Sequence, residues 1–420
     1  MAKKEIEHTS TTLGNQDMKG SQRMVSVVEP YELPEGWEWV KVGEVAEIIN
    51  GKNQKEVEDE NGIYPIYGSG GIIGRATDFI CPENCTIIGR KGTINNPIFV
   101  ETKFWNVDTA FGMKTFDCVA PKFYFYFCKS FNFLTLDSST AIPSLTKSNI
   151  QQIPFPLPPT LAEQQRIVNR IESMFAKLDE AKEKAQNVVD GFEIRKAAIL
   201  HKAFTGELTA KWRKENGVSD DSWEEKTIGE ICLVKGGKRV PKGMSLIKEK
   251  NEHPYLKAGN LKFGTVIDKD MEYVPNDVFI LIKNYTVNAG DVYITNVGAC
   301  IGDCGIIPDY YHGASLTENA VKLTEMICIN SYLAKQLSSN LVQTQIKSKI
   351  KSATLGKLSI DNIKQLKINL PTLPEQQEIV RILDSVLEKE RTAKQAAEAV
   401  LEQIDLLKKS ILARAFRGEL

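Results

Sequence analysis

The chain has 420 residues, of which 42% are hydrophobic and 25% charged, and its formal net charge at pH 7 is −1. This composition is that of an ordinary folded protein of about two to four domains and excludes a disordered or fibrous chain. A net charge so close to zero also argues against a protein that coats nucleic acid without regard to sequence, because such coating relies on excess positive charge.

The first segment, residues 1–30, is a polar N-terminal extension of mixed charge. No apolar run in the chain approaches the roughly 18 residues that cross a bilayer. The eight cysteines are widely spread, which is typical of single buried thiols in a reducing compartment and not of a disulfide framework. The sequence therefore predicts a cytoplasmic protein with no membrane partner.

Residues 31–158 and 223–370 predict two mostly β domains. Both segments are rich in Gly, Asn, Val, Ile and aromatic residues, and their short apolar runs, such as Cys85–Gly89, are bounded by turn residues. A helix is expected in each domain, over residues 122–132 and 329–350. Because these features follow in the same order, the two domains are expected to share a topology.

Residues 159–208 and 371–420 predict two long helices, and a polar connector, residues 209–222, joins the first helix to the second domain. Apolar residues recur at alternating spacings of four and three, which is the seam of a coiled coil. The predicted seam is Ile167, Ile171, Met174, Leu178, Ala181, Ala185, Val188, Phe192, Arg195 and Ile199 in the first helix, and Ile379, Leu383, Val386, Glu390, Ala393, Ala397, Val400, Ile404, Leu407 and Ile411 in the second. Paired alanines at the centre of each seam let two backbones approach closely, which favours an antiparallel pair.

The ends of both helices carry matching signals. Thr160 and Thr372 are candidate N-caps. Glutamates three residues later, Glu163 and Glu375, suit the positive end of a helix dipole. Gly206 and Gly418 are placed for left-handed C-terminal caps.

The chain is thus an internal repeat. Pro159–Val168 returns as Pro371–Val380, and Ala203–Leu208 returns as Ala415–Leu420. The segments between them differ in length and in their loops. The fold class that follows is α+β, with two mostly-β domains separated by two long α-helices that form an antiparallel coiled coil with pseudo-twofold symmetry. Two matching helical segments with domains of unequal length between them suggest a protein that recognises two different targets at a fixed distance.

The sequence offers no catalytic centre. The glycines of Gly68–Gly74 have the wrong spacing for a dinucleotide fingerprint, and there is neither a phosphate-binding GxxxxGK[ST] loop nor an amino-methyltransferase motif. Asp303, Asp309 and Glu318 lack the spacing of a Mg²⁺ site, and the four histidines stand in unrelated contexts. Cys81/Cys85 and similar pairs have no further ligands nearby for zinc. We expect a protein that is not an enzyme and binds no metal.

These residues resemble the specificity subunit of type I restriction-modification systems, and the resemblance covers nearly the whole chain. The segments that carry it are residues 156–168 and 369–380 at the helix entries, Phe204–Leu208 and Phe416–Leu420 at the exits, and Tyr64–Gly74 and Ile88–Gly92 in the first domain. The resemblance implies that each β domain is a target recognition domain for one half of a split DNA site. It also implies that the helices act as a spacer and dock methyltransferase subunits. The chain departs from a simple doubled pattern at Glu390.

The same resemblance implies partners and cofactors. The partners are double-stranded DNA, two methyltransferase subunits and, in the full complex, two restriction subunits that translocate DNA. S-adenosylmethionine, ATP and Mg²⁺ are expected on those subunits and no cofactor on this chain. Because the loops of the two domains differ, we expect an asymmetric bipartite target.

Side-chain chemistry indicates the candidate residues for DNA contact, because Arg and Lys suit guanine, Asn and Gln suit adenine, and cations and hydroxyls suit phosphates. In the first domain they are Lys52, Asn53, Gln54, Lys55, Ser69, Arg75, Arg90, Lys91, Ser139, Thr140 and Lys147. In the second they are Lys238, Arg239, Lys242, Asn260, Lys262, Asn296, Lys351, Thr354 and Lys357. Two alternatives stay open at this point: a structural adaptor whose two domains bind proteins, and a fused methyltransferase or nuclease.

Overall fold

The computed structural model describes residues 30–137, 142–350 and 356–420. They fall into two compact units. One contains the described residues up to Ala181 together with Glu402–Leu420, and the other is Lys182–Leu401. Within the described residues no helix is long and apolar enough to cross a membrane. In that same part of the chain, no three or more His, Cys, Asp or Glu residues are grouped to hold a metal ion.

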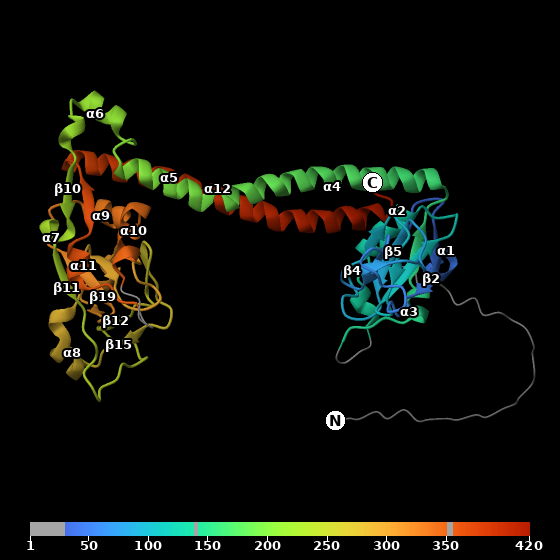
Figure 1. Ribbon diagram of the computed structural model, residues 1–420, viewed down its shortest axis with the longest axis horizontal. Coiled ribbons are helices and arrows are strands. Elements are labelled where there is room, and N and C mark those ends of the chain that lie inside the picture. The colour runs from blue at the N-terminus through green and yellow to red at the C-terminus, as the bar shows by residue number, and fades with distance from the viewer. Residues whose placement is uncertain (1–29, 138–141, 351–355) are drawn as a thin grey trace, which may run out of the picture. The chain divides into compact units, whose positions relative to one another are not determined.

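The first unit contains a β domain whose strands form three small sheets (Figure 1). The entry pair is β1 (Glu38–Lys41) with β9 (Pro154–Leu157). The four-stranded sheet runs β2 (Ala46–Asn50), β8 (Ala110–Thr115), β5 (Cys85–Gly89) and β6 (Ile98–Val100). The three-stranded sheet runs β4 (Gly71–Ala76), β3 (Tyr64–Gly68) and β7 (Trp105–Asn106). The helices are α1 (Val42–Val45), α2 (Pro121–Ser130), the 3₁₀ turn η1 (Phe133–Leu136) and α3 (Lys147–Gln151).

The second unit repeats this plan in a longer segment. The entry pair is β10 (Glu224–Thr227) with β20 (Lys367–Leu370). The four-stranded sheet runs β11 (Leu233–Gly236), β19 (Ala320–Thr324), β16 (Val292–Thr295) and β17 (Cys304–Ile306). The three-stranded sheet runs β15 (Glu272–Tyr273), β12 (Pro254–Leu256) and β18 (Ser315–Leu316), and a hairpin pairs β13 (Leu261–Lys262) with β14 (Thr265–Val266).

Short helices complete the second unit. They are α6 (Ala210–Asn216), α7 (Ile228–Ile231), α8 (Asn276–Ile282), α9 (Asn330–Leu337), α10 (Asn340–Lys349) and α11 (Ile360–Lys364), with 3₁₀ turns η2 (Asp220–Ser222), η3 (Lys283–Tyr285) and η4 (Asp309–Tyr311). In Figure 1, α9 and α10 lie between the sheet strands and α5 (Phe192–Phe204), and both contact α5. The single helix predicted over residues 329–350 is therefore corrected to two helices, separated at Ser338 and Ser339.

The strand orders of the two domains correspond one to one. In each four-stranded sheet all neighbours are antiparallel, and in each three-stranded sheet one pair is parallel: β3 with β7, and β12 with β18. The prediction of a shared topology is confirmed, together with the α+β class and the internal repeat. The additional elements β13, β14 and α8 lie in the longer second domain.

The long helices are α4 (Leu161–Asp190), α5 and α12 (Leu373–Ala415). Within the first unit, Asp179 pairs with Lys408 at 2.5 Å and Arg166 donates to the carbonyl of Leu420 at 2.8 Å. Within the second, Arg195 pairs with Glu390 at 2.8 Å. Residue numbers rise on one helix as they fall on the other, so the helices of each unit pack antiparallel, as predicted.

The seam prediction is right for the first helical segment and partly wrong for the second. All ten positions on α4 and α5 are buried or half-buried. On α12, Ala393, Val400 and Leu407 are exposed. The neighbouring Lys394 lies over the Phe192 ring and Lys408 over the Phe175 ring. After Ala393 and Leu407 the seam therefore includes the following lysine, because a lysine stem covers an aromatic ring while its ammonium group stays in water.

The repeated Glu-Gln-Gln segment of each helix entry has a structural role. Gln164 accepts from the backbone N–H of Ala120 at 2.8 Å, and Ala120 is the residue just before α2. Gln376 accepts in the same way from Ile329, just before α9, at 2.9 Å. Both amide side chains are buried. Each thus fastens a domain helix to a long helix by satisfying an N-terminal donor that the helix leaves free.

The predicted helix ends are mostly confirmed. The Thr160 hydroxyl accepts from the backbone N–H of Glu163 at 3.2 Å, whereas at Thr372 it is the backbone carbonyl that accepts, from Gln376. Gly206 and Gly418 have φ of +83° and +72°, which is the left-handed conformation of a C-terminal cap.

Cysteine reactivity provides a test of the burial pattern. Six thiols are buried, Cys300 is half-buried and Cys118 is exposed. Burial raises the pKa of Cys85 and Cys232 to about 12, which keeps these thiols protonated and unreactive. We expect iodoacetamide at pH 8 to modify Cys118 first, Cys300 more slowly, and the rest only after unfolding. Mass spectrometry of the native protein checks this; rapid labelling of Cys85 would contradict it.

Candidate nucleic-acid interface

Several loops of each domain meet at the end of the four-stranded sheet. Gly51 and Gly237 follow the first strand of that sheet, and a Cβ atom on either would lie 1.8 Å and 2.1 Å from the carbonyl oxygens of Val107 and Thr317. The absence of a side chain lets the loop pack against the segment that precedes β8 or β19. The following residue is a lysine in both domains.

These lysines are fixed by equivalent backbone hydrogen bonds. The N–H of Lys52 donates to the carbonyl of Asn106 at 2.9 Å, and that of Lys238 to Leu316 at 2.8 Å. The Lys52 carbonyl accepts from Trp105 Nε1, and the Lys238 carbonyl from the Tyr255 hydroxyl. Both lysines are exposed. The matched glycines thus place one cation at the same point of each domain.

A second loop, which follows β5 in one domain and β16 in the other, shows the same correspondence. Arg90 donates its N–H to Thr109 at 2.7 Å and Asn296 donates to Asn319 at 2.9 Å. The carbonyls of Arg90 and Asn296 accept from Leu145 and Leu358. The loops are therefore held by one set of backbone bonds and carry different side chains.

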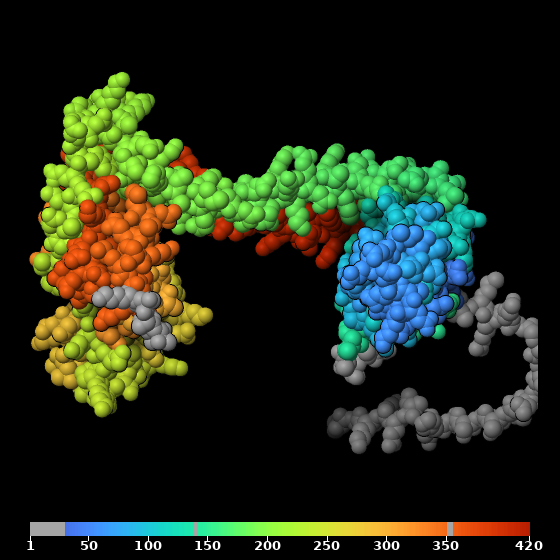
Figure 2. Space-filling view, viewed as in Figure 1, coloured from blue at the N-terminus to red at the C-terminus, as the bar shows by residue number. Residues whose placement is uncertain are grey.

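The structure brings together part of the predicted set. In the first domain Lys52, Arg90 and Lys91 surround residues 106–109, and a Cβ on Gly92 would lie 3.7 Å from the Ser69 hydroxyl. Figure 2 shows the region of the loop after β2 and the β3–β4 turn, coloured blue, on the surface of this domain. In the second domain Lys238 and Arg239 lie beside residues 316–318. Lys357 bridges Val297, as Ser144 bridges Lys91 in the first domain.

Two of the residues predicted to contact DNA are buried. Asn260 is 1% exposed, and its side chain accepts from Lys257 and donates to the carbonyls of Ile267 and Lys269. Asn296 is 5% exposed and its side-chain amide donates to the Leu358 carbonyl. Both amides hold neighbouring backbone in place and lie below the surface where the predicted DNA contact would be made.

The other residues predicted to contact DNA remain predictions. Three of them donate a side-chain hydrogen bond within the protein: Arg75 to the Gly62 carbonyl at 3.4 Å, Lys147 to the Ile48 carbonyl at 3.1 Å, and Lys262 to Cys300 Sγ at 3.5 Å. Gln54 is half-buried, whereas Asn53, Lys55 and Lys242 are exposed. Ser139, Thr140, Lys351 and Thr354 lie outside the described residues.

The sequence did not single out an acidic side chain beside each lysine. Asp108 and Glu318 occupy the same place, two residues after the carbonyl that holds Lys52 or Lys238. Partial burial raises the pKa of Glu318, but the bond and charge of Arg239 outweigh it and hold that pKa below its usual range, so the carboxylate is ionised at neutral pH. The signal was the matching run of an acidic residue, a polar residue and Ala110 or Ala320 before each strand.

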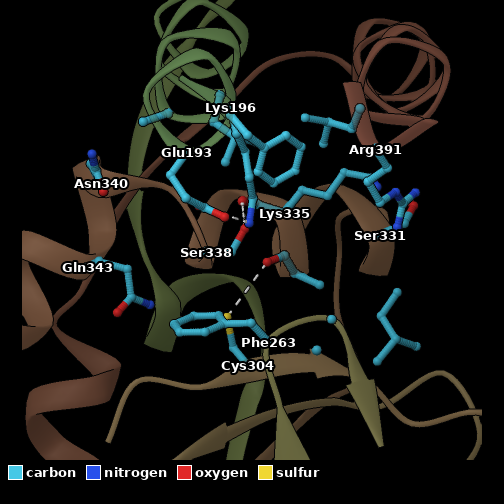
Figure 3. A pocket seen from close by; sticks show the side chains of 18 of the residues that line it. Glu193, Lys196, Phe263, Cys304, Ser331, Lys335, Ser338, Asn340, Gln343 and Arg391 are labelled. Carbon is cyan, nitrogen blue, oxygen red and sulfur yellow. Dashed lines mark hydrogen bonds and ion pairs between the residues drawn. The ribbon is translucent and has the colours of Figure 1, made fainter. Parts of the chain in front are cut away.

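A separate cavity of about 870 Å³ lies within the second unit, between the long helices and the domain (Figure 3). Leu200, Leu387 and Phe263 line it together with charged residues that are paired, such as Lys335 with Asp384 at 2.5 Å. Burial raises the pKa of the Cys304 thiol at its base. A thiol that stays protonated is a poor nucleophile.

The close approach at Gly51 predicts a stability effect. Gly51→Ala forces a methyl group against the Val107 carbonyl, and we expect unfolding of the first domain to become easier by about 1–3 kcal/mol. Gly70→Ala is the matched control, because the nearest atom to its Cβ is 4.0 Å away. Urea denaturation compares them. Equal stabilities for the two variants would show that the loop is not fixed by this contact.

Known proteins provide the remaining comparison. The model of the type I restriction modification DNA specificity domain matches residues 34–189 and 220–403. The EcoKI specificity subunit of Escherichia coli K12 is 25% identical over 440 residues, covering 93% of this chain and 90% of that protein. The EcoBI specificity subunit of Escherichia coli is 25% identical over 304 residues, covering 67% of this chain and 62% of that protein.

A solved structure has the same fold. The crystal structure of the HsdS subunit from Thermoanaerobacter tengcongensis superposes with a TM-score of 0.65 at 19% identity, covering 94% of this chain and all of that one. The family model matches both halves of the chain and includes most of α4 and α12 as well as the domains. The chain therefore belongs to the family of type I restriction-modification specificity subunits.

Proposed function

We propose that the chain is the sequence-specific DNA-binding subunit of a type I restriction-modification complex. Each recognition domain reads one half of a bipartite target, and the two halves differ in sequence. The long helices set the gap between the halves and hold the methyltransferase and restriction subunits. The proposal places the complex in the cytoplasm, where it meets DNA.

One observation supports the asymmetric target above all others. The two domains hold equivalent loops by equivalent backbone bonds, yet Arg90 and Lys91 of one correspond to Asn296 and Val297 of the other. The first domain carries a cation pair at this loop, whereas the second carries an apolar residue beside an amide that is buried, so the two loops cannot make the same contacts with a base edge. One scaffold with two side-chain sets suits two unlike half-sites.

The proposal assigns the chemistry to the partners. S-adenosylmethionine would bind to the methyltransferase subunits, and ATP and Mg²⁺ to the restriction subunits, with two copies of each around one specificity chain. This chain contributes recognition and no catalytic step. The family membership and the names of the relatives, which are specificity subunits of restriction enzymes, support this division.

Selection from random duplexes tests the proposal. The chain, assembled with its methyltransferase subunit, is incubated with a random duplex library, and bound DNA is sequenced. We expect enrichment of two unlike short motifs at a fixed gap and an affinity that falls with salt, because phosphate contacts release counterions. Binding without enrichment, or no salt-dependent binding, would favour an adaptor whose domains bind proteins.

A further inference from the structure

The second recognition domain carries an arginine that is oriented by a carboxylate. Arg239 Nε donates to Glu318 Oε1 at 2.5 Å. The arginine side chain is 78% exposed and the glutamate 29%. The guanidinium thus projects from the loop after β11, but it is tied to a partly buried anchor.

The Glu318 carboxylate is in turn held by neighbouring hydroxyl groups. Glu318 Oε2 lies 3.2 Å from the Thr317 hydroxyl and 3.3 Å from the Tyr255 hydroxyl. Tyr255 is 4% exposed on β12, and its single hydroxyl hydrogen is shared between Glu318 Oε2 and the carbonyl of Lys238, which lies 2.9 Å from the hydroxyl oxygen. Sheet, loop and carboxylate are therefore connected, so the direction of the guanidinium is set before any ligand arrives.

The geometry leaves the outer edge of the guanidinium available. The bond to Glu318 uses Nε, and among residues 30–137, 142–350 and 356–420 the two terminal nitrogens of Arg239 make no other hydrogen bond. Two parallel N–H groups in one plane match the O6 and N7 acceptors of guanine in the major groove.

The carboxylate also decides between a base and a phosphate as the ligand. An ionised Glu318 in contact with Arg239 offsets its positive charge and repels a phosphate at close range. A guanine edge is uncharged and needs directed donors more than net charge. The pair is therefore better suited to a base than to the backbone.

We propose that Arg239 reads a guanine in the second half-site and that Glu318 is the positioning residue that orients it. This rests on the proposed function, in which the second domain reads one half of a split target. The corresponding positions of the first domain hold Asn53 and Asp108, where the Asn53 side chain accepts from the N–H of Lys55. The pair of Arg239 and Glu318 therefore contributes to recognition of the second half-site only.

The test uses the full chain assembled with its methyltransferase subunit and duplexes with each base of the mapped target changed in turn. Arg239→Ala is expected to reduce discrimination at one G·C pair of the second half roughly 5- to 150-fold. All positions of the first half are expected to stay as in the wild type. Asn53→Ala is the matched control, since any change it causes must fall in the first half.

Glu318→Ala separates positioning from a purely structural role. We expect it to weaken discrimination at the same G·C pair, by less than Arg239→Ala does, and to have no further effect in the Arg239→Ala background. An unchanged first half in every variant shows that the chain still folds and assembles.

Three results would overturn the inference. Arg239→Ala could weaken all duplexes equally and lower the salt dependence by about one phosphate contact. The second half-site could contain no G·C pair, or Glu318→Ala could add fully to Arg239→Ala. A wild-type complex that reads no motif at all would be a different failure, that of the proposed function.

Discussion

Inserting four residues at opposing places in α4 and α12 is expected to move the two half-sites apart by one or two base pairs and to change neither half. Four residues lengthen a helix by about 6 Å, which is between one and two steps of the DNA rise of about 3.4 Å. They also add slightly more than one helical turn, so the faces beyond the insertion stay nearly in phase.

The structure fixes where the insertions must lie. Asp179 faces Lys408 in an antiparallel register, so Ala181 lies opposite residues 405 and 406. The insertions therefore belong after Ala181 and after Asp405. Insertions after Ala181 and Ala393, which are equivalent positions of the two repeats, would lie at different levels, because Glu390 lies against Arg195.

Modification mapping of the doubly inserted chain checks this prediction. The original gap should be lost as a target and a longer gap gained, with both half-sites intact. An insertion in α4 alone is the control, since it mispairs the two seams and should abolish modification at every gap. Unchanged spacing in the doubly inserted chain would contradict the role of the helices as a spacer.

Replacing Arg213 is expected to cause the largest loss of stability in the second unit. Glu375 is fully buried, and its Oε1 accepts from Arg213 Nη1 at 2.7 Å, from the Thr209 hydroxyl at 2.7 Å and from Trp223 Nε1 at 3.1 Å. Arg213→Ala leaves that carboxylate buried without a counter-charge. We expect a cost of about 3–5 kcal/mol, measured by urea denaturation followed through tryptophan fluorescence.

The first unit provides the matched control. Glu163 stands at the equivalent helix entry but pairs with Arg166 on the surface, where the two side chains are 30% and 52% exposed. Arg166→Ala should cost about 1 kcal/mol or less. Adding Glu375→Gln to Arg213→Ala should restore part of the stability, because no buried charge then remains. A loss below about 1 kcal/mol for Arg213→Ala alone would contradict this assignment.

Repetition made most of the fold predictable. The helix entries, the left-handed caps at Gly206 and Gly418 and the seam of α4 all follow from local spacing. The seam of α12 did not, since the heptad pattern favours Ala393 and Leu407 over the lysines that follow them. Whether a lysine stem covers a ring depends on the facing helix, as at Lys408 and Phe175, and single-sequence spacing does not contain that information.

The candidate site was less predictable for a related reason. Asn260 and Asn296 have side chains suited to adenine, but the fold buries both, and their amide nitrogens donate to backbone carbonyls. Glu318 is negatively charged, as phosphate is, so side-chain chemistry alone does not predict it at a DNA-binding surface. Its role depends on contact with Arg239, which lies 79 residues away in the sequence.

Single-molecule sequencing of DNA from a host that expresses this chain with its methyltransferase subunit shows which sites the assembled complex modifies. We expect a split motif with two unlike halves, a fixed gap and methyladenine in both halves. Methylation of one palindromic site would contradict the asymmetric reading. No modification by a stable complex with an active methyltransferase partner would contradict DNA recognition itself.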